Sequence, residues 1–202
     1  TGHTDSVNVR KMQMNTRVAD ISFILDQLVK IQSGKIESQI NAKIDLERIA
    51  VGGHSYGGST ATVVSQRDNR IKACFSLDSW ISPIPQETID DGVHIPFLFM
   101  GRPTWEGSDY PGNYPRLDSL MAHSSNPKYR LIIKGTKHLD YSDIPLFSPI
   151  IGYVLDVGSN PAALTVSLIN GLVHGFLVKH LLGESNNIFD NAIDNDLVYQ
   201  IQ

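Results

Sequence analysis

The sequence predicts an α/β fold, in which a mainly parallel sheet is covered by helices on both faces. Four apolar runs have the length of strands, and they lie at Ile49 to Gly52, Ile71 to Leu77, His94 to Met100 and Tyr129 to Lys134. Segments with helical periodicity separate them, and strands that are apolar throughout are typical of parallel sheets buried on both faces. A chain of 202 residues fits one domain with a sizeable core, so we treat residues 1–202 as a single domain.

Four helices are expected around these strands. The first is amphipathic, runs from about Asn15 to Ser33 and ends at Gly34, because apolar residues recur there at helical spacing. The other three are expected at Tyr56 to Gln66, Leu117 to His123 and Pro161 to Leu182. Polar residues and glycines interrupt the apolar run of the last helix, which therefore predicts a buried helix and no transmembrane segment.

The composition argues against several kinds of function. The 17 basic and 21 acidic side chains give a net charge of −4 and form no basic run, so no nucleic-acid partner is expected. The single cysteine, Cys74, lies in an apolar strand and is interpreted as a core residue. The histidines lack the spacing of metal ligands, and neither a metal nor another cofactor is expected.

The most informative motif is Gly-x-Ser-x-Gly at Gly53 to Gly57, directly after an apolar strand and directly before a helix. This context predicts a sharp strand-to-helix turn that exposes the hydroxyl of Ser55, with glycine at 53 and 57 because a Cβ there would clash. The helix that follows points free backbone N–H groups at the same place, where they stabilise a developing oxyanion. Ser55 is therefore predicted to be a nucleophile.

A serine nucleophile needs a histidine base that a carboxylate holds in one tautomer. Of the five histidines after the motif, only His138 follows a strand within a Gly-x-x-His turn, so it is the predicted base. We prefer Asp78 as the acid because it directly follows the strand Ile71 to Leu77, where the backbone is rigid. Glu106 and Asp109, which follow the next strand, stay as the alternative acids.

Three long segments after strand ends are expected to line a site, since ligands bind beyond the carboxyl ends of the strands in open α/β sheets. They are Ser79 to Val93, Gly101 to Arg116 and Leu139 to Ser159. Three aromatic residues of these segments are candidates for substrate binding: Trp80, Trp105 and Phe147.

Three segments of the chain resemble the catalytic blocks of plasma-type platelet-activating-factor acetylhydrolases, which are serine esterases and lipases of the α/β-hydrolase fold. They are Ile49 to Gly58 (IAVGGHSYGG), Ser76 to Pro83 (SLDSWISP) and Lys134 to Asp143 (KGTKHLDYSD). The segments Thr16 to Leu28 and Phe176 to Gly183 are also similar to helices of that family, so the resemblance covers nearly the whole chain.

The resemblance implies a hydrolase with the catalytic triad Ser55, Asp78 and His138, and with the N–H of Tyr56 in the oxyanion hole. It implies short acyl esters as substrates, with phospholipids among them, cleaved without calcium. The alternatives are an acyl-peptide or serine peptidase on the same fold, and a noncatalytic relative that binds acyl ligands. A secreted or periplasmic location is favoured over a cytoplasmic one.

The second donor of the oxyanion hole normally comes from a loop after an early strand of this fold. Residues Thr1 to Ser6 are interpreted as the tail of the strand that follows that loop, together with its turn. The first strands of the sheet and any signal peptide would then lie before Thr1. Residues 1–202 would form the C-terminal catalytic portion of the domain, with an open sheet edge through which chains associate.

Overall fold

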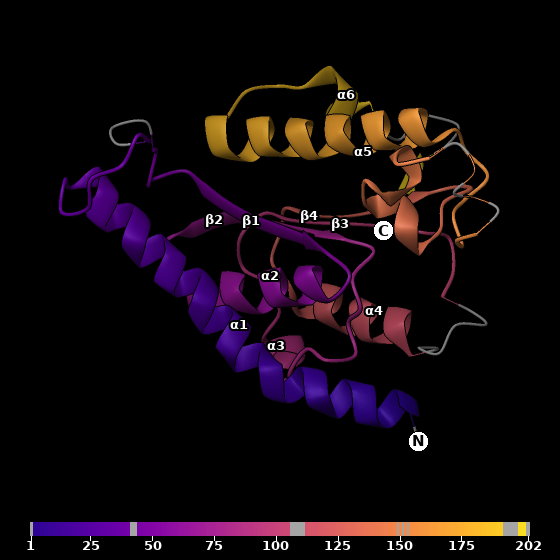
Figure 1. The fold of residues 1–202 in the computed structure, drawn as a ribbon, viewed down its shortest axis with the longest axis horizontal. Helices are drawn as coiled ribbons and strands as arrows, with labels where there is room; N and C mark the ends of the chain where they lie inside the picture. The colour runs from indigo at the N-terminus through magenta and orange to yellow at the C-terminus, as the bar shows by residue number, and fades with distance from the viewer. Residues whose placement is uncertain are drawn as a thin grey trace.

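The computed structural model describes residues 2–40, 44–105, 112–148, 150, 152, 154–191 and 198–200. A five-stranded sheet lies between two layers of helices (Figure 1). Its strands follow one another in chain order: β1 (Ile49–His54), β2 (Ile71–Leu77), β3 (Phe97–Gly101), β4 (Lys128–Ile133) and β5 (Val198–Gln200). The first four pair in parallel and β5 is antiparallel to β4, which confirms the expected α/β class with its mainly parallel sheet.

The helices divide between the two faces of the sheet (Figure 1). One layer contains α1 (Gly2–Gln32), α2 (Tyr56–Arg67), α3 (Gln86–Asp91) and α4 (Asn113–His123). The other contains α5 (Ala162–Leu177), which continues as a π-helical turn η4 (Val178–Leu182), and the short α6 (Asn187–Asp190). Two 3₁₀ turns follow β4 and lead toward α5: η1 (His138–Tyr141) and η2 (Ile144–Leu146).

The side chains of the strands alternate between two hydrophobic cores, one under each helical layer. In β3, Phe97 and Phe99 belong to the core of α1, α2 and α4, whereas Leu98 and Met100 belong to the core of α5 and α6. All residues of β3 are buried, as a strand covered on both faces requires. Cys74 is fully buried in the first core, which confirms its interpretation as a core residue.

Helix α1 is longer than the sequence analysis predicts. It begins at Gly2 instead of Asn15, so residues 2–6 are helical and their interpretation as the tail of a strand is wrong. Met14 is fully buried and Val18 nearly so, and both pack in the core of α2, which extends the helix toward the N-terminus. Tertiary packing of this kind stabilises helical turns that have weak local signals.

Helix α4 also begins earlier, at Asn113 instead of Leu117. Pro115 lies in its first turn, where the missing backbone N–H would have no partner within the helix. The buried side chain of Asn113 accepts a hydrogen bond from the N–H of Ile81 and donates to the carbonyl of Ser79. The start of α4 is therefore fixed by the segment after β2, which the local sequence does not reveal.

The C-terminal helix is buried along one side only, which corrects its interpretation as a buried helix. The buried residues of α5 are Thr165, Ile169, Leu172, Gly175 and Phe176. By length and composition, Ala162–Leu182 is the one helix among the described residues that could cross a membrane, with a mean hydropathy of 1.4 and 28% of its window buried. The packing of this helix on the sheet favours the expectation of no transmembrane segment, which stays a prediction.

Candidate active site

A single residue connects β1 to α2, and that residue is Ser55. Its backbone has φ 56° and ψ −126°, in the left-handed half of conformational space that residues other than glycine rarely occupy. Four backbone hydrogen bonds hold it there: its N–H donates to the Leu77 carbonyl at 3.0 Å, and its carbonyl accepts from Gly58 at 3.1 Å and from Ser59 and Trp80 at 3.3 Å. The strained turn between strand and helix is thus fixed by the neighbouring strand and by the loop after it.

Two glycines give this turn its room. A Cβ on Gly53 would lie 2.5 Å from the carbonyl carbon of Gly57, and a Cβ on Gly58 would lie 1.8 Å from Ser79 Oγ. A Cβ on Gly57 would meet nothing within 4 Å, so the expectation that Gly57 avoids a clash is wrong. Helix α2 approaches the segment after β2 most closely at Gly58, one residue after the last glycine of the motif, Gly57.

The structure brings Ser55, His138 and Asp78 together from three separate elements. His138 Nε2 lies 2.9 Å from Ser55 Oγ, and His138 Nδ1 lies 2.7 Å from Asp78 Oδ2. Because the carboxylate accepts at Nδ1, the proton of a neutral His138 is on Nδ1 and the lone pair of Nε2 faces the serine hydroxyl. The three side chains form one continuous chain of hydrogen bonds.

Asp78 is fully buried directly after β2, with a positive φ of 39°. Its backbone N–H donates to the Met100 carbonyl at 2.6 Å, which ties the turn to β3. A buried carboxylate needs donors or a cation. Besides His138, Arg102 supplies both: its N–H donates to Oδ1 at 3.2 Å and its Nε lies 3.3 Å from Oδ2. The alternative acids Glu106 and Asp109 lie outside the described residues.

Arg102 is a site residue that the sequence analysis missed. It comes directly after β3, and β2 and β3 are parallel neighbours, so the residues that follow the two strands meet at one edge of the sheet. The one feature of the sequence that could have pointed to Arg102 is its position directly after the end of a strand. A lone arginine in a loop has no motif that would identify it.

The three aromatic candidates differ in their relation to the triad. The Trp105 ring is buried, with its centroid 5.5 Å from that of His138 and the Arg102 guanidinium 3.9 Å above it. Trp80 is buried beside the turn, with its ring 6.4 Å from Tyr56. Phe147 is 77% exposed after η2, and among the described residues no ring contact joins it to His138. Trp105 is thus the aromatic candidate that the structure brings to the triad.

The side chain of Tyr56 points away from Ser55 and packs on α1. Its hydroxyl donates to the Arg10 carbonyl at 2.6 Å, and the guanidinium of Arg17 lies 4.9 Å from the ring centroid. Burial raises the pKa of its phenol. Ser55 makes no side-chain hydrogen bond that caps α2. The contribution that Tyr56 can make next to Ser55 is therefore its backbone N–H, the first of the helix.

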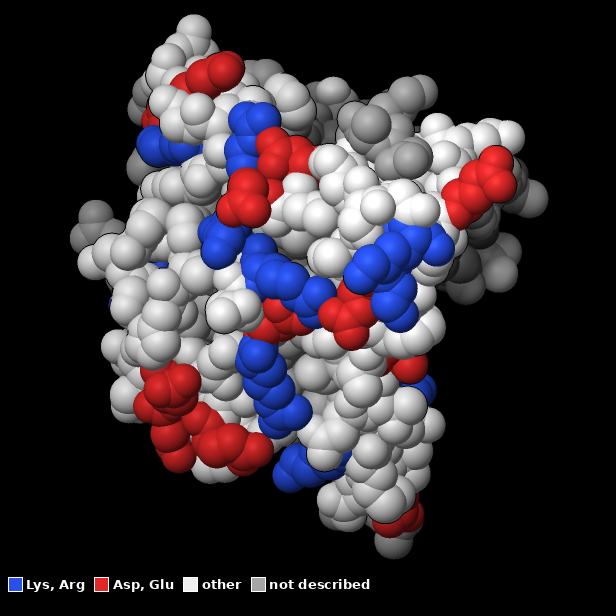
Figure 2. All heavy atoms as spheres, turned by 90° about the vertical axis from the view of Figure 1, so that its left-hand side faces the viewer, with Lys and Arg blue, Asp and Glu red and all other residues white. Residues whose placement is uncertain are grey.

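On the face in Figure 2, basic side chains in the middle lie next to acidic ones, and a separate group of acidic side chains lies at the lower left. Arg70, for example, pairs with Asp26 at 2.7 Å and with Asp68 at 2.6 Å. Such pairing neutralises part of the positive charge, and the expectation of no nucleic-acid partner stays a prediction. Among the described residues, no group of three or more histidine, cysteine or acidic side chains is placed to hold a metal ion.

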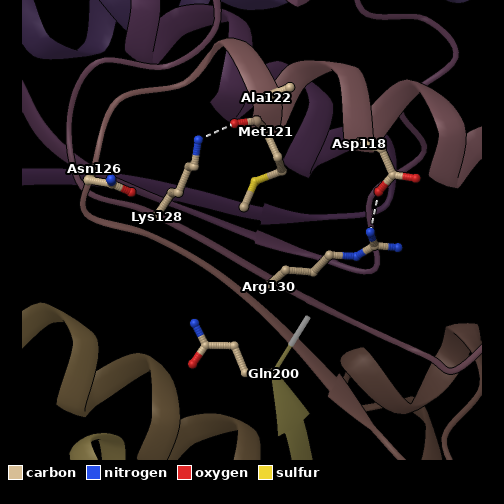
Figure 3. A pocket seen from close by; sticks show the side chains of 7 residues that line it. All are labelled: Asp118, Met121, Ala122, Asn126, Lys128, Arg130 and Gln200. Atoms are coloured by element: carbon tan, nitrogen blue, oxygen red, sulfur yellow. Dashed lines mark hydrogen bonds and ion pairs between the residues drawn. The ribbon is translucent and has the colours of Figure 1, made fainter. Parts of the chain in front are cut away.

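A cavity of about 660 Å³ lies away from the triad, between α4, β4 and β5 (Figure 3). Its two cations already have partners: Lys128 donates to the carbonyls of Met121 and Ser124, and Arg130 pairs with Asp118. These contacts attach α4 to β4. None of the three triad residues lines the cavity, so its size alone does not make it the reaction centre.

The class of the protein follows from its fold. A solved structure of a ferulic acid esterase from Streptomyces cinnamoneus superposes on 96% of this chain and 56% of its own, with a TM-score of 0.75 and 22% sequence identity. Together with the mainly parallel sheet and the turn at Ser55, this likeness establishes the α/β-hydrolase fold. Residues 2–197 match the family model described as platelet-activating factor acetylhydrolase, isoform II. The chain belongs to this family.

Curated relatives agree with the family. The platelet-activating factor acetylhydrolase of Gallus gallus is 27% identical over 199 residues, which cover 92% of this chain and 46% of that protein. The Bos taurus protein of the same name is 28% identical over 204 residues, which cover 93% of this chain and 44% of that protein. The chain thus spans less than half the length of these two relatives.

Proposed function

We propose that this chain carries the catalytic triad of a carboxylic-ester hydrolase, with Ser55 as nucleophile, His138 as base and Asp78 as the acid that orients it. The observation that carries this proposal is the continuous hydrogen-bond chain, 2.9 Å from Ser55 Oγ to His138 and 2.7 Å from His138 to Asp78. The membership in an acetylhydrolase family and the fold shared with an esterase support the same class of reaction.

In this mechanism, Ser55 Oγ attacks the ester carbonyl carbon while His138 Nε2 takes the hydroxyl proton. The tetrahedral intermediate collapses as His138 returns this proton to the departing alcohol, which leaves an acyl group on Ser55. A water molecule then gives a proton to His138 and attacks the acyl-enzyme. His138 returns this proton to Ser55 Oγ as the acid departs, which restores the free enzyme. Asp78 keeps His138 Nδ1 protonated throughout and stabilises the imidazolium.

The N–H of Tyr56 is proposed as one donor of the oxyanion hole. It is the first N–H of α2, directly after the nucleophile, and Ser55 does not use its side chain to cap the helix. The positive end of the helix dipole favours negative charge at this place. We propose that the second donor comes from polypeptide outside residues 1–202 that lies beside the edge of β1. Residues 1–202 would then form the catalytic portion of one larger domain.

Short acyl esters, with phospholipids among them, are the proposed substrates. The names of the Gallus gallus and Bos taurus relatives indicate release of an acetyl group from a phospholipid. Two cations adjoin the triad in this structure: Arg102 is bound to the buried Asp78, and Lys137, next to His138, forms an exposed pair with Asp156. Neither is part of a cluster of cations that would bind a multiply anionic headgroup. We therefore propose that the site selects its substrates by the acyl chain of the ester and not by the headgroup.

Labelling with a fluorophosphonate probe tests the proposed nucleophile. Ser55→Ala should abolish labelling and lower the turnover of a p-nitrophenyl ester by about 10⁴ or more, since the acyl-enzyme cannot form. Ser33→Ala is the matched control, because Ser33 is an exposed serine at the end of α1. Undiminished labelling of the Ser55→Ala variant would show that another residue is the nucleophile.

A further inference from the structure

His54, the residue before the nucleophile, contacts the base directly. Its Nε2 lies 2.9 Å from the backbone carbonyl oxygen of His138. The two imidazole rings also lie together, with centroids 4.5 Å apart and planes inclined by 40°. His54 ends β1 and His138 begins η1, 84 residues later in the chain. The strand that carries the nucleophile is therefore attached to the backbone of the base by a side chain that the triad does not include.

The identity of the acceptor fixes the protonation of His54. A carbonyl oxygen can only accept a hydrogen bond. His54 Nε2 therefore carries a proton and donates a hydrogen bond to the backbone carbonyl of His138. Burial lowers the pKa of the His54 imidazole, and the neighbouring His138 lowers it further. The hydrogen bond to the carbonyl and the carboxylate of Asp78 act in the opposite direction. Within the described residues, the titratable groups that act on His54 are thus His138 on η1 and Asp78 after β2.

The turn that contains His138 is otherwise held mainly from within and from the segment near residue 158. Asp140 Oδ2 accepts from the N–H of Lys137 at 2.7 Å and from that of Gly158 at 2.6 Å. The N–H of Ser159 donates to Gly135 at 2.8 Å. These contacts shape the turn. The bond from His138 to Asp78 and the packing of the buried Tyr141 hold it against the sheet, and the hydrogen bond from His54 joins its backbone directly to the end of β1.

We propose that His54 is a positioning residue for the base: as a neutral donor to the His138 carbonyl, it sets where His138 Nε2 meets Ser55. This inference rests on the proposed function of the triad. Because His54 directly precedes Ser55 in the chain, this hydrogen bond links the backbone of the base to the nucleophile, in addition to the bond from Asp78 to the His138 ring. A neutral His54 also leaves the neighbouring His138 free to gain a proton during the reaction. A charged His54, with its ring centroid 4.5 Å away, would oppose this protonation.

Two substitutions separate the hydrogen bond from the aromatic ring. His54→Phe keeps a ring of similar size but removes the donor, and we expect kcat to fall about 10- to 100-fold with KM nearly unchanged. His54→Gln restores an N–H at similar reach, and it should recover most of the lost kcat. His123→Phe is the control, since His123 also bonds a backbone carbonyl, at Ser119, but lies exposed on α4.

The spectroscopic test follows the imidazoles themselves. In the wild-type protein, ¹⁵N NMR at pH 7 should show His54 as the neutral Nε2–H tautomer, because the bond to the His138 carbonyl requires the proton on Nε2. The inference is overturned if His54 at pH 7 is charged or is the Nδ1–H tautomer, or if His54→Phe keeps the wild-type kcat while remaining folded. Failure of the triad itself is recognised separately, because only then does Ser55→Ala remain reactive with the fluorophosphonate.

Discussion

Arg102 holds the carboxylate of Asp78 at both oxygens, with its backbone N–H 3.2 Å from Oδ1 and its Nε 3.3 Å from Oδ2. The same guanidinium lies 3.9 Å from the ring centroid of Trp105, whose ring reaches His138. Asp78 has no exposed surface, so these contacts replace the water that would otherwise solvate its charge. The orientation of the acid and the wall beside the base thus depend on one arginine.

Removing this arginine should damage both stability and turnover. Arg102→Met leaves the buried Asp78 with hydrogen bonds from His138 and the backbone but without a permanent cation, and we expect a loss of about 3 kcal/mol in the free energy of unfolding. We also expect kcat to fall about 10- to 100-fold, since the carboxylate can rotate away from His138. Urea denaturation and ester kinetics measure the two effects.

Arg48→Met is the control for the arginine prediction. Arg48 pairs with Asp45 on the surface, where both side chains are about half exposed, and such a pair contributes about 0 to 1 kcal/mol. Equal losses of stability for the Arg102 and Arg48 variants would contradict the assignment of a structural role to the buried pair.

The choice of Asp78 over the two later acids has its own test. Asp78→Asn should lower kcat by about 10⁴, because an amide cannot hold the Nδ1–H tautomer of His138. Glu106→Gln and Asp109→Asn, by contrast, should change kcat little. Ester hydrolysis measured for all three variants decides between them, and a large loss confined to Glu106 or Asp109 would move the acid to the loop after β3.

The proposed acyl specificity predicts an order of substrates. The buried Trp105 ring lies 5.5 Å from the His138 ring, and Arg102 and Lys137 are both in ion pairs, so we expect acetyl to butyryl esters to have a higher kcat/KM than long-chain lipids. Esters should also be cleaved faster than the corresponding N-acyl peptides. A higher kcat/KM for the peptide than for its ester analogue would favour the peptidase alternative.

The ion pair of Arg70 with the buried Asp68 predicts how stability depends on pH. The Arg70 side chain donates two hydrogen bonds to Asp68 and lowers the pKa of this carboxyl from 3.8 to about 2. A depressed folded-state pKa contributes stability above the unfolded pKa, and this stability is lost as the pH falls toward 2. Asp68→Asn should therefore cost about 1 to 2 kcal/mol at pH 7 and progressively less below pH 4.

Urea denaturation of the Asp68→Asn variant at several pH values between 7 and 2.5 measures this dependence. Asp20→Asn, an exposed change on α1, serves as the control and should leave stability nearly unchanged at every pH. A constant difference between wild type and Asp68→Asn down to pH 2.5 would contradict the contribution of the ionised carboxylate.

The sequence reveals those parts of the site that depend on local patterns. Ser55 stands between a strand and a helix, and Asp78 and His138 each follow a strand, so their places at one end of the sheet could be predicted from chain order. His54 and Arg102 could not be assigned roles in this way. Their importance comes from residues that lie far away in sequence, His138 for the first and the parallel neighbour strand for the second.

The elements of the fold show the same difference between local patterns, which the sequence reveals, and distant contacts, which it does not. Strands β2 and β4 agree with the sequence analysis within one residue at each end, because apolar runs mark strands that are buried on both faces. The first half of α1 and the start of α4 were missed, because Met14 and Asn113 gain their partners from other elements. The antiparallel β5 has three residues, too few for a periodic signal.

Strand β1 carries the nucleophile and yet lies at the edge of the described sheet, paired with β2 alone. All its residues are partly or fully exposed, whereas every residue of β3 is buried. On the neighbouring helix α1, Phe23 is 61% and Ile24 55% exposed. These features predict that further strands, from polypeptide outside residues 1–202, pair with β1 and supply the second oxyanion donor.

The prediction compares the 202-residue chain with a longer protein that includes those strands. The chain alone should react slowly with a fluorophosphonate and turn over esters about 10² to 10³ more slowly, since loss of one oxyanion donor has that effect. It should also associate through the open edge of β1, which size-exclusion chromatography at increasing concentration detects. If the two proteins have equal kcat values, a residue within Thr1 to Gln202 supplies the second donor, and β1 does not need a further strand for catalysis.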